Sequence, residues 1–213
     1  PARASRKDEL LAVQAGVHDM LLDRLGPQMS WIKVIREALD DDGIFVDELT
    51  QVGYVSRVAM PVYQPRKYLS SAYQGTLGCG LGVAIGAKIA NPERQVLSIN
   101  GDGGFMYNVQ ELATAAKYNV NVVAIVFADG AFGNVRRMQE ELYDGRTIAS
   151  DLHNPDFVKM AESFGCAAYR AESPDELAKV LPTAFKQSGP AVIEVPFPKT
   201  PDPWPIIIPG RNR

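Results

Sequence analysis

From about residue 95 onward, the chain alternates short apolar segments with segments of helical periodicity. The apolar segments lie at residues 95–100, 121–128, 166–169 and 191–195. Their continuous apolar character predicts strands buried on both faces, which are typical of parallel sheets. Helices are expected at residues 109–118, 132–141, 156–164 and 174–187. The alternation predicts the α/β class, as a three-layer open parallel sheet with helices on both faces.

The region before this alternation is expected to begin with two helices. Leu10, Val13, Val17, Leu21 and Leu25 recur at helical spacing and predict an amphipathic helix over residues 5–25. The pair at positions 26 and 27, glycine then proline, should end that helix. The serine at position 30 should then cap a second helix that runs to about residue 39.

The stretch between these helices and residue 95 carries weaker signals. A short buried strand is expected at residues 44–46 and a loop at residues 47–53. A polar and aromatic stretch follows to residue 73, and a glycine-rich segment from residue 75 leads into a helix that ends near residue 90. The proline-rich tail from residue 196 is expected to be extended.

Composition excludes several classes of protein. The net charge is −3, with both signs interspersed, so no basic surface for nucleic acid is indicated. No apolar run approaches the length of a membrane span and no signal peptide is visible, so a cytoplasmic location is expected. Cys79 and Cys166 match no metal-binding or iron–sulfur spacing and are expected to be free thiols.

Asp102 lies in a glycine-rich turn between a predicted strand and a predicted helix. The segment reads Ser98-Ile99-Asn100-Gly101-Asp102-Gly103-Gly104-Phe105. Ligands of open parallel sheets bind at the carboxyl ends of the strands, and glycines let the backbone approach them closely. The unpaired N–H groups at the start of the next helix suit a phosphate. An aspartate would repel that phosphate unless a divalent cation lay between them, so the turn predicts a metal–phosphate site.

A second turn of the same kind follows the next predicted strand. It reads Ala128-Asp129-Gly130-Ala131, and Asp129 follows Asp102 by 27 residues, about one helix and one strand. Neighbouring strand ends would therefore bring the two carboxylates together. Either turn alone is a common surface feature, but the pair at this spacing favours a shared site.

The two turns and their surroundings resemble a known family. Gly101-Asp102-Gly103 and the later turn at residues 128–130 resemble the thiamine diphosphate signature. Residues 75–87 and 109–115 resemble the segments before and after that signature in the acetolactate synthase, benzoylformate decarboxylase and pyruvate decarboxylase family. The similarity runs from about residue 32 to residue 195 and is specific to the C-terminal, diphosphate-binding domain. It implies the thiamine diphosphate-binding fold.

The resemblance implies a role for each matching residue. Asp102, Asp129 and the backbone carbonyl of Ala131 would bind Mg²⁺. The diphosphate and the remainder of the cofactor would lie against Gln51, Val52, Gly101, Gly103, Gly104 and Phe132. The carbonyls of Gly75 and Leu77 would face the aminopyrimidine, and Leu77 would hold the cofactor in its bent conformation. Without the neighbouring motif, Leu77 would be read as a core residue and Gln51 as a solvated loop residue.

Two positions depart from the family pattern. Asp129 stands where the family usually has asparagine, which adds a negative charge beside an anionic diphosphate. The oxygen ligand is retained, but the charge can lower the affinity or favour Ca²⁺ or Mn²⁺. Val52 stands where related synthases carry a polar residue.

The family resemblance also implies that the site is incomplete in this chain. The catalytic glutamate of the family belongs to a separate pyrimidine-binding domain, supplied across a subunit interface, and no such domain fits in 213 residues. We expect a fragment of a longer polypeptide, or else a subunit that needs a partner, in a homodimer or tetramer. Residues 1–29 are interpreted as a linker helix from a preceding domain, residues 30–195 as the cofactor-binding domain and residues 196–213 as a tail.

The substrate is expected to be a 2-oxo acid or a related carbonyl compound, without a closer identification. Phe132, Val135 and Met138 are candidates for the substrate pocket, although helical core packing explains them equally well. Arg136 and Arg137 could bind a substrate carboxylate or be surface charges. The last ten residues, from position 204 to 213, resemble C-terminal arms that cover such sites in some relatives, or else form a surface tail.

The sequence suggests three alternatives to this function. A dinucleotide site at Gly78-Cys79-Gly80-Leu81-Gly82, with Asp102 as the ribose acid, fails because the third glycine of that motif falls on Val83. A non-catalytic cofactor-binding module stays open because of Asp129. The chain could also be the diphosphate-binding subunit of a two-subunit oxoacid decarboxylase. An oxidoreductase of that kind is disfavoured, because the sequence has no cysteine pattern for an iron–sulfur cluster.

Overall fold

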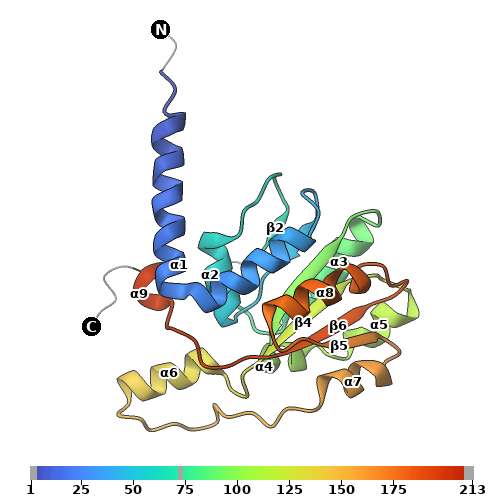
Figure 1. Cartoon of the computed structure of the whole chain (residues 1–213). Helices are drawn as coiled ribbons and strands as arrows, with labels where there is room; N and C mark the ends of the chain where they lie inside the picture. The colour runs from blue at the N-terminus through green and yellow to red at the C-terminus, as the bar shows by residue number, and fades with distance from the viewer. Residues whose placement is uncertain (1–3, 72–73, 209–213) are drawn as a thin grey trace.

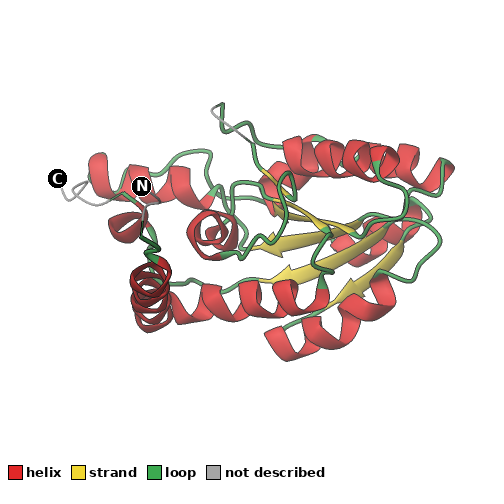
Figure 2. Cartoon of the chain, turned by 90° about the horizontal axis from the view of Figure 1, so that it is seen from above, coloured by secondary structure: helices red, strands yellow, loops and turns green. Residues whose placement is uncertain are grey.

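The computed structural model describes residues 4–71 and 74–208, and its centre is one parallel sheet (Figures 1 and 2). The order of the six strands across the sheet is β2-β1-β3-β4-β6-β5, and every neighbouring pair is parallel. The strands are β1 (Ile44–Val46), β2 (Tyr68–Leu69), β3 (Val96–Gly101), β4 (Val123–Ala128), β5 (Ala167–Arg170) and β6 (Ala191–Pro196). The predicted parallel α/β architecture is confirmed.

Helices cover both faces of the sheet, which gives three layers (Figure 2). One face packs against α1 (Lys7–Ala38), α2 (Gln51–Ala59) and α8 (Pro174–Ala184). The other packs against α3 (Cys79–Ala90), α4 (Asp102–Tyr107), α5 (Glu111–Lys117) and α7 (Phe157–Ser163). Successive strand residues alternate between the two cores: Leu97 and Ile125 belong to the first, Val96 and Val126 to the second. Burial on both faces explains why these strands are continuously apolar.

The strand order places a crevice between β1 and β3. The chain passes from β1 through α2 on one face to β2, and returns through α3 on the opposite face to β3. The connections leaving the carboxyl ends of β1 and β3 therefore run to opposite faces, which opens a space between them. Open α/β sheets bind ligands at such a point. The turn after β3 and the segment after β1 both border it.

The first helix differs from the prediction because its two parts are joined without a loop. Leu25 leaves the helical region, with φ −128° and ψ 29°, and the chain bends there while Pro27 lies inside the following helical turn. A proline is tolerated in a first turn because the N–H it lacks has no partner there. Ser30 is not an N-cap, since its hydroxyl donates to the Gly26 carbonyl at 2.9 Å.

The exposed part of α1 projects from the body of the domain (Figure 1). Leu10, Val13 and Val17 of the predicted apolar face are exposed, whereas Leu21 and Leu25 are buried. From Leu21 onward the helix packs into the core. Residues on both sides of the expected domain boundary at residue 29 belong to the same core. The division into linker, cofactor-binding domain and tail stays a prediction.

Helix α2 begins inside the segment predicted to be a loop. Thr50 is its N-cap, and its hydroxyl accepts a hydrogen bond from the Gly53 N–H at 2.8 Å. Val52 and Val55 pack into the core and are fully buried. The loop prediction was wrong from Gln51 onward because this short helix contains a glycine and shows only a brief apolar pattern.

The segment after α2 contributes an edge strand that the sequence did not reveal. Tyr68 of β2 pairs with Phe45 of β1, and the two rings lie 5.3 Å apart. The tail was also only partly extended, because residues Trp204–Ile207 form a short helical turn, α9. The remaining tail residues 209–213 lie outside the described residues, so the expectation of an arm there has no structural outcome. No helix in the described part of the chain is long and apolar enough to cross a membrane.

Candidate functional site

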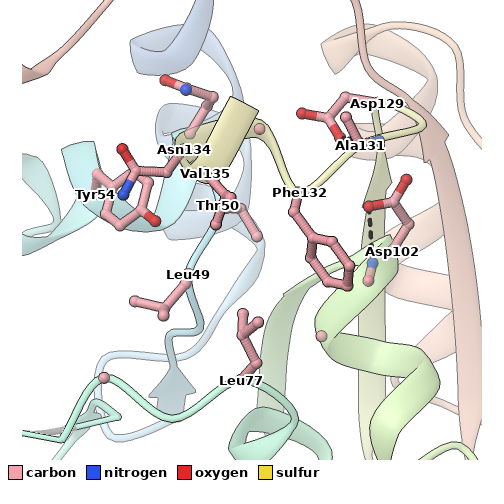
Figure 3. A pocket seen from close by; sticks show the side chains of 15 residues that line it. Leu49, Thr50, Tyr54, Leu77, Asp102, Asp129, Ala131, Phe132, Asn134 and Val135 are labelled. Atoms are coloured by element: carbon pink, nitrogen blue, oxygen red, sulfur yellow. Dashed lines mark hydrogen bonds between the residues drawn. The ribbon is translucent and has the colours of Figure 1, made fainter. Parts of the chain in front are cut away.

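A pocket of about 270 Å³ lies at the carboxyl ends of β1, β3 and β4 (Figure 3). It is bordered by the residues after β1, the α4 turn, the loop into α6 (Gly133–Leu142) and the glycine-rich segment before α3. The sequence-predicted residues that line it are Gln51, Gly75, Leu77, Asp102, Gly103, Gly104, Asp129, Ala131 and Phe132. Four separate segments thus bring these residues together, as adjacent strand ends predict.

Two residues of the predicted set do not line this pocket. Val52 is fully buried and its side chain belongs to the core between the sheet and α1, α2 and α8. A valine at this position is explained by packing. Gly101 ends β3 and is covered by the segment before α2, since a Cβ built on it would lie 3.4 Å from the Leu49 carbonyl oxygen.

Asp102 is 1% exposed and its carboxylate is held by three hydrogen bonds. Oδ1 accepts from the Gly103 N–H at 2.8 Å (the dashed line in Figure 3). Oδ2 accepts from the Gly130 N–H at 2.8 Å and from the Asn154 Nδ2 group at 2.7 Å. A carboxylate has about four lone-pair sites, so one remains free for a cation. These bonds fix the orientation of Asp102 before any ligand binds.

Asp129 reaches the same pocket from the end of β4. Its Oδ1 accepts a hydrogen bond from the Ala131 N–H at 3.2 Å, and the residue as a whole is exposed to solvent. Loss of hydration raises the pKa of Asp129 to about 6, and the Asp102 carboxylate adds to the shift. A divalent cation between the two carboxylates would offset this repulsion.

The loop that carries Asp129 and Ala131 is fixed by a second segment that the sequence did not reveal. Ala131 forms an antiparallel bridge with Asp151. The Phe132 N–H donates to the Ser150 carbonyl, and the Leu152 N–H donates to the Gly130 carbonyl, each at 2.8 Å. Asn154 lies just beyond this bridge and bonds Asp102. An asparagine in a loop between two predicted helices gave no signal of that role.

Leu77 points into the pocket from the turn before α3 (Figure 3). It is half-buried and does not belong to either core. Gly75 and Gly78, on either side of it, have φ values of +57° and +85°, which favour glycine. Phe132 lies across the pocket beside Gly103, where an added Cβ would come 2.4 Å from the ring. The turn and the ring thus form apolar walls beside the two carboxylates.

The pocket has an unusual charge balance for an anion site. Asp102 and Asp129 line it, and no lysine, arginine or histidine does so among the described residues. No group of three or more histidine, cysteine, aspartate or glutamate side chains suited to a metal is found in the described part of the chain. Two carboxylates and a backbone carbonyl fit Mg²⁺, which commonly takes one or two protein carboxylates and completes its shell with phosphate oxygens.

The candidate substrate residues on α6 fall into different surroundings. Phe132, just before α6, lines the pocket, and Met138 lines a separate apolar hollow with Tyr143 and Ile148. Val135 borders both. None of the residues of α6 is buried in the described structure. Core packing, the alternative explanation for these residues, is not seen for Met138 and Val135, since both are exposed.

Both candidate arginines are engaged in ion pairs. Arg136 pairs with Glu140 at 3.3 Å and with Asp151 at 2.8 Å. Arg137 pairs with Glu141 at 2.5 Å and lies 5.6 Å over the Trp204 ring. The Trp204 ring also lies 4.8 Å from the ring of Tyr54, which lines the pocket. The tail is thereby packed against α2 and α6 beside the pocket.

Glu48 is a buried acidic residue that sequence analysis missed. It lies two residues after the end of β1 and is fully buried, yet it does not line the pocket. Its carboxylate accepts hydrogen bonds from the Gly78 and Gly80 N–H groups. Burial raises the pKa of Glu48, and these two bonds oppose that shift.

Comparison with known proteins identifies relatives of this arrangement. The family model "Thiamine pyrophosphate enzyme, C-terminal TPP binding domain" matches residues 50–195. The acetolactate synthase of Bacillus subtilis (strain 168) is 38% identical over 179 residues, covering 84% of this chain and 31% of that protein. The probable 2-ketoarginine decarboxylase AruI of Pseudomonas aeruginosa is 35% identical over 199 residues, covering 91% of this chain and 34% of that protein.

A solved structure agrees with these sequence relatives. The thiamine diphosphate-dependent 4-hydroxybenzoylformate decarboxylase of Rhodococcus jostii RHA1 superposes with a TM-score of 0.74 and 30% identity. The match covers 80% of this chain and 32% of that one. The chain spans about a third or less of the length of the relatives described here.

Proposed function

The chain belongs to the thiamine pyrophosphate enzyme family, as its C-terminal cofactor-binding domain, and we propose from this that it binds thiamine diphosphate through a divalent metal. We propose further that it forms part of an acetolactate-synthase-like decarboxylase or carboligase. The substrate would be a 2-oxo acid or a related carbonyl compound. The metal is proposed from one observation: two carboxylates line the pocket, and among the described residues no basic side chain lines it.

The residues of the pocket fit such a group. Asp102, Asp129 and the Ala131 carbonyl would hold the metal, with Mg²⁺ expected and Ca²⁺ or Mn²⁺ as alternatives. The backbone of Gly103 and Gly104, together with Gln51, would hold the diphosphate. The Gln51 Oε1 atom is buried at the pocket without a hydrogen-bond partner among the described residues. This oxygen is an acceptor, so the diphosphate would be held by the NH₂ group of the same amide, and Oε1 would face the metal or a donor. Val52 would contact a ligand only through its backbone, since its side chain lies in the core.

The remaining pocket residues would orient the cofactor and exclude water. Leu77 would support the bent conformation, and the Gly75 and Leu77 carbonyls would face the aminopyrimidine. Phe132 would cover the apolar side of the group. Bound thiamine diphosphate supplies the carbon nucleophile and accepts the electron pair released from the substrate, so the protein contributes mainly binding, orientation and electrostatics.

Catalysis would require a glutamate, and no glutamate lines the pocket among the described residues. We propose that a pyrimidine-binding domain supplies it, either from the same longer polypeptide or from a partner subunit. The assembly would be a homodimer or a tetramer. The chain's share of its relatives' length supports this proposal, because most of their residues lie outside the matched region. A cytoplasmic location stays a prediction.

Calorimetric titration tests the metal-dependent binding. Thiamine diphosphate is titrated into the protein in Mg²⁺ and in EDTA, and into the Asp102→Ala variant. Binding should need Mg²⁺ and should be lost in the variant, because Asp102 is the buried ligand. Asp23→Ala, on the exposed part of α1, is the matched control and should bind like the parent protein. Binding that persists in EDTA, or in Asp102→Ala, would contradict the proposed site.

One observation favours a second candidate function. The Asp129 carboxylate adds a second negative charge where a diphosphate would lie. A module that binds the cofactor without turnover would tolerate that change, whereas a catalyst could lose affinity or activity through it. Asp129→Asn decides between them in the complete protein: activity gained on substitution would identify a module disabled by Asp129, and activity already present in the parent would exclude that reading.

A further inference from the structure

Glu48 is one of the buried acidic groups that the proposed chemistry leaves without a role. It is fully buried, two residues after the end of β1, while the next residues, Leu49 and Thr50, line the pocket. Oε1 accepts a hydrogen bond from the Gly78 N–H at 2.8 Å, and Oε2 accepts one from the Gly80 N–H at 3.0 Å. Both acceptor atoms are therefore directed at one turn, thirty or so residues away along the chain.

Glycines make room for the Glu48 carboxylate on two sides. A Cβ at Gly104 would lie 1.8 Å from Oε1, and a Cβ at Gly80 would lie 2.7 Å from Oε2. These glycines are in the first turns of α4 and α3 respectively. The carboxylate therefore occupies the space where the diphosphate-facing turn and the turn before α3 approach each other.

The turn that Glu48 binds carries Leu77. Gly78 has φ +85°, and its carbonyl accepts a hydrogen bond from the Asn108 Nδ2 group at 2.7 Å. Glu48 and Asn108 thus fix the two polar groups of the Gly78 backbone. Leu77 precedes Gly78 directly and extends into the pocket. Any displacement of Gly78 would move the Leu77 side chain with it.

We propose that Glu48 is a positioning residue, whose carboxylate clamps the turn of residues 75–80 against the α4 turn and so sets the place of Leu77 in the cofactor pocket. This inference rests on the proposed function for the identity of the ligand. Two acceptor oxygens are needed, because the two glycine N–H groups are both donors. An amide in place of the carboxylate keeps the shape but sets its NH₂ group against one of these donors.

Glu48→Gln tests the clamp with two independent measurements on the complete protein. The first is hydrogen exchange of the amides in residues 75–81, which should be faster in the variant by about tenfold, the equivalent of one lost hydrogen bond. The second compares the affinity for thiamine diphosphate with that for inorganic diphosphate, both in Mg²⁺. Thiamine diphosphate should bind about tenfold more weakly, while diphosphate alone should change by less than about twofold.

The matched control is Glu194→Gln, a largely buried glutamate on β6 that accepts a hydrogen bond from Arg170. It makes the same chemical change on a strand that β3 and β4 separate from β1 in the sheet. It should leave the exchange of residues 75–81 and both affinities unchanged. Equal weakening of both ligands by Glu48→Gln, with uniformly faster exchange, would show a merely structural role and overturn the proposal.

The two arms separate this inference from the proposed function. If the parent protein binds neither ligand, the proposed function fails, and the exchange measurement still decides whether Glu48 holds the turn. If the parent binds and Glu48→Gln shows unchanged exchange and affinity, the clamp is overturned alone. Should Glu48→Gln not fold, Glu48→Asp takes its place, because its shorter carboxylate keeps the charge but loses reach. Failure of both variants to fold would overturn positioning in favour of a structural role.

Discussion

Asp129 shows how a single residue can link the chemistry of the pocket to the stability of the fold. Its pKa is raised to about 6, first by loss of hydration and then by Asp102. The folded protein therefore holds a proton on this group more tightly than the unfolded chain. That contribution is complete below the ordinary aspartate pKa and is lost as the pH rises through about 6.

Asp129→Asn should remove this dependence. In EDTA, the free energy of unfolding of the variant minus that of the parent should become more positive between pH 4 and pH 7. The difference should grow by about 1 kcal/mol, a discounted value because solvent reaches the side chain. Urea unfolding at the two pH values measures it. A difference that does not change with pH would show that Asp129 has an ordinary pKa in the folded state.

Individual residues also show where sequence reasoning ends. Asp102, Asp129 and Leu77 could be identified because the strand-turn-helix pattern and the family motif place them. Asn154 and Glu48 could not, because each acts through a contact with a segment distant in sequence. Nothing local distinguishes an asparagine in a loop or a glutamate after a strand. Val52 was expected at the cofactor, but its side chain lies in the core because residue 52 belongs to helix α2, which was not predicted.

At the scale of elements, glycines with different surroundings have opposite roles. In α4, a Cβ at Gly103 would lie 2.4 Å from Cε1 of Phe132 and 3.0 Å from Leu152. In α3, a Cβ at Gly86 would meet nothing within 4 Å. The first glycine allows the loop into α6 to approach the α4 turn. The second is an ordinary helical position where alanine is the better helix former.

The pair gives a matched test of that approach. Gly103→Ala should lower the free energy of unfolding by about 1–3 kcal/mol, because Phe132 must leave its place. Gly86→Ala should raise it by about 0.5–1 kcal/mol. Chemical denaturation measures both, and adding Phe132→Ala to Gly103→Ala should recover part of the loss. Equal effects of the two alanines would show that Phe132 does not pack on α4.

The helices and strands also differ in how accurately they could be predicted from the sequence. The long apolar strands β3, β4 and β6 were predicted to within a few residues, because burial on both faces leaves a continuous apolar pattern. The helices α5, α6, α7 and α8 were also predicted to within a few residues, whereas α4 was not predicted as a separate helix. The short elements α2 and β2 were missed. Their stability depends on packing against α1 and β1, which no local pattern shows. The sequence at residues 26 and 27, glycine then proline, predicted a helix end, whereas the structure has a kink at Leu25 and the helix continues.

At the scale of the whole molecule, the pocket holds the groups for binding but not those for proton transfer. Its lining contains no glutamate or histidine among the described residues. Asp102 is already committed by three hydrogen bonds, and Asp129 would face the metal. Glu48 is turned to Gly78 and Gly80 and is sealed from the pocket.

The chain by itself should therefore bind thiamine diphosphate with Mg²⁺ and yet show no turnover. The measurement is release of CO₂ from pyruvate and from an aromatic 2-oxo acid by the purified chain. The control is the same assay after a family pyrimidine-binding domain is added or fused, where activity should return if that domain supplies the missing glutamate. A glutamine at the catalytic position of the added domain should abolish the recovery. Because general acid–base groups typically contribute about 10²–10⁴-fold, turnover by the chain alone at the level of the complemented protein would mean that a base lies within the chain itself.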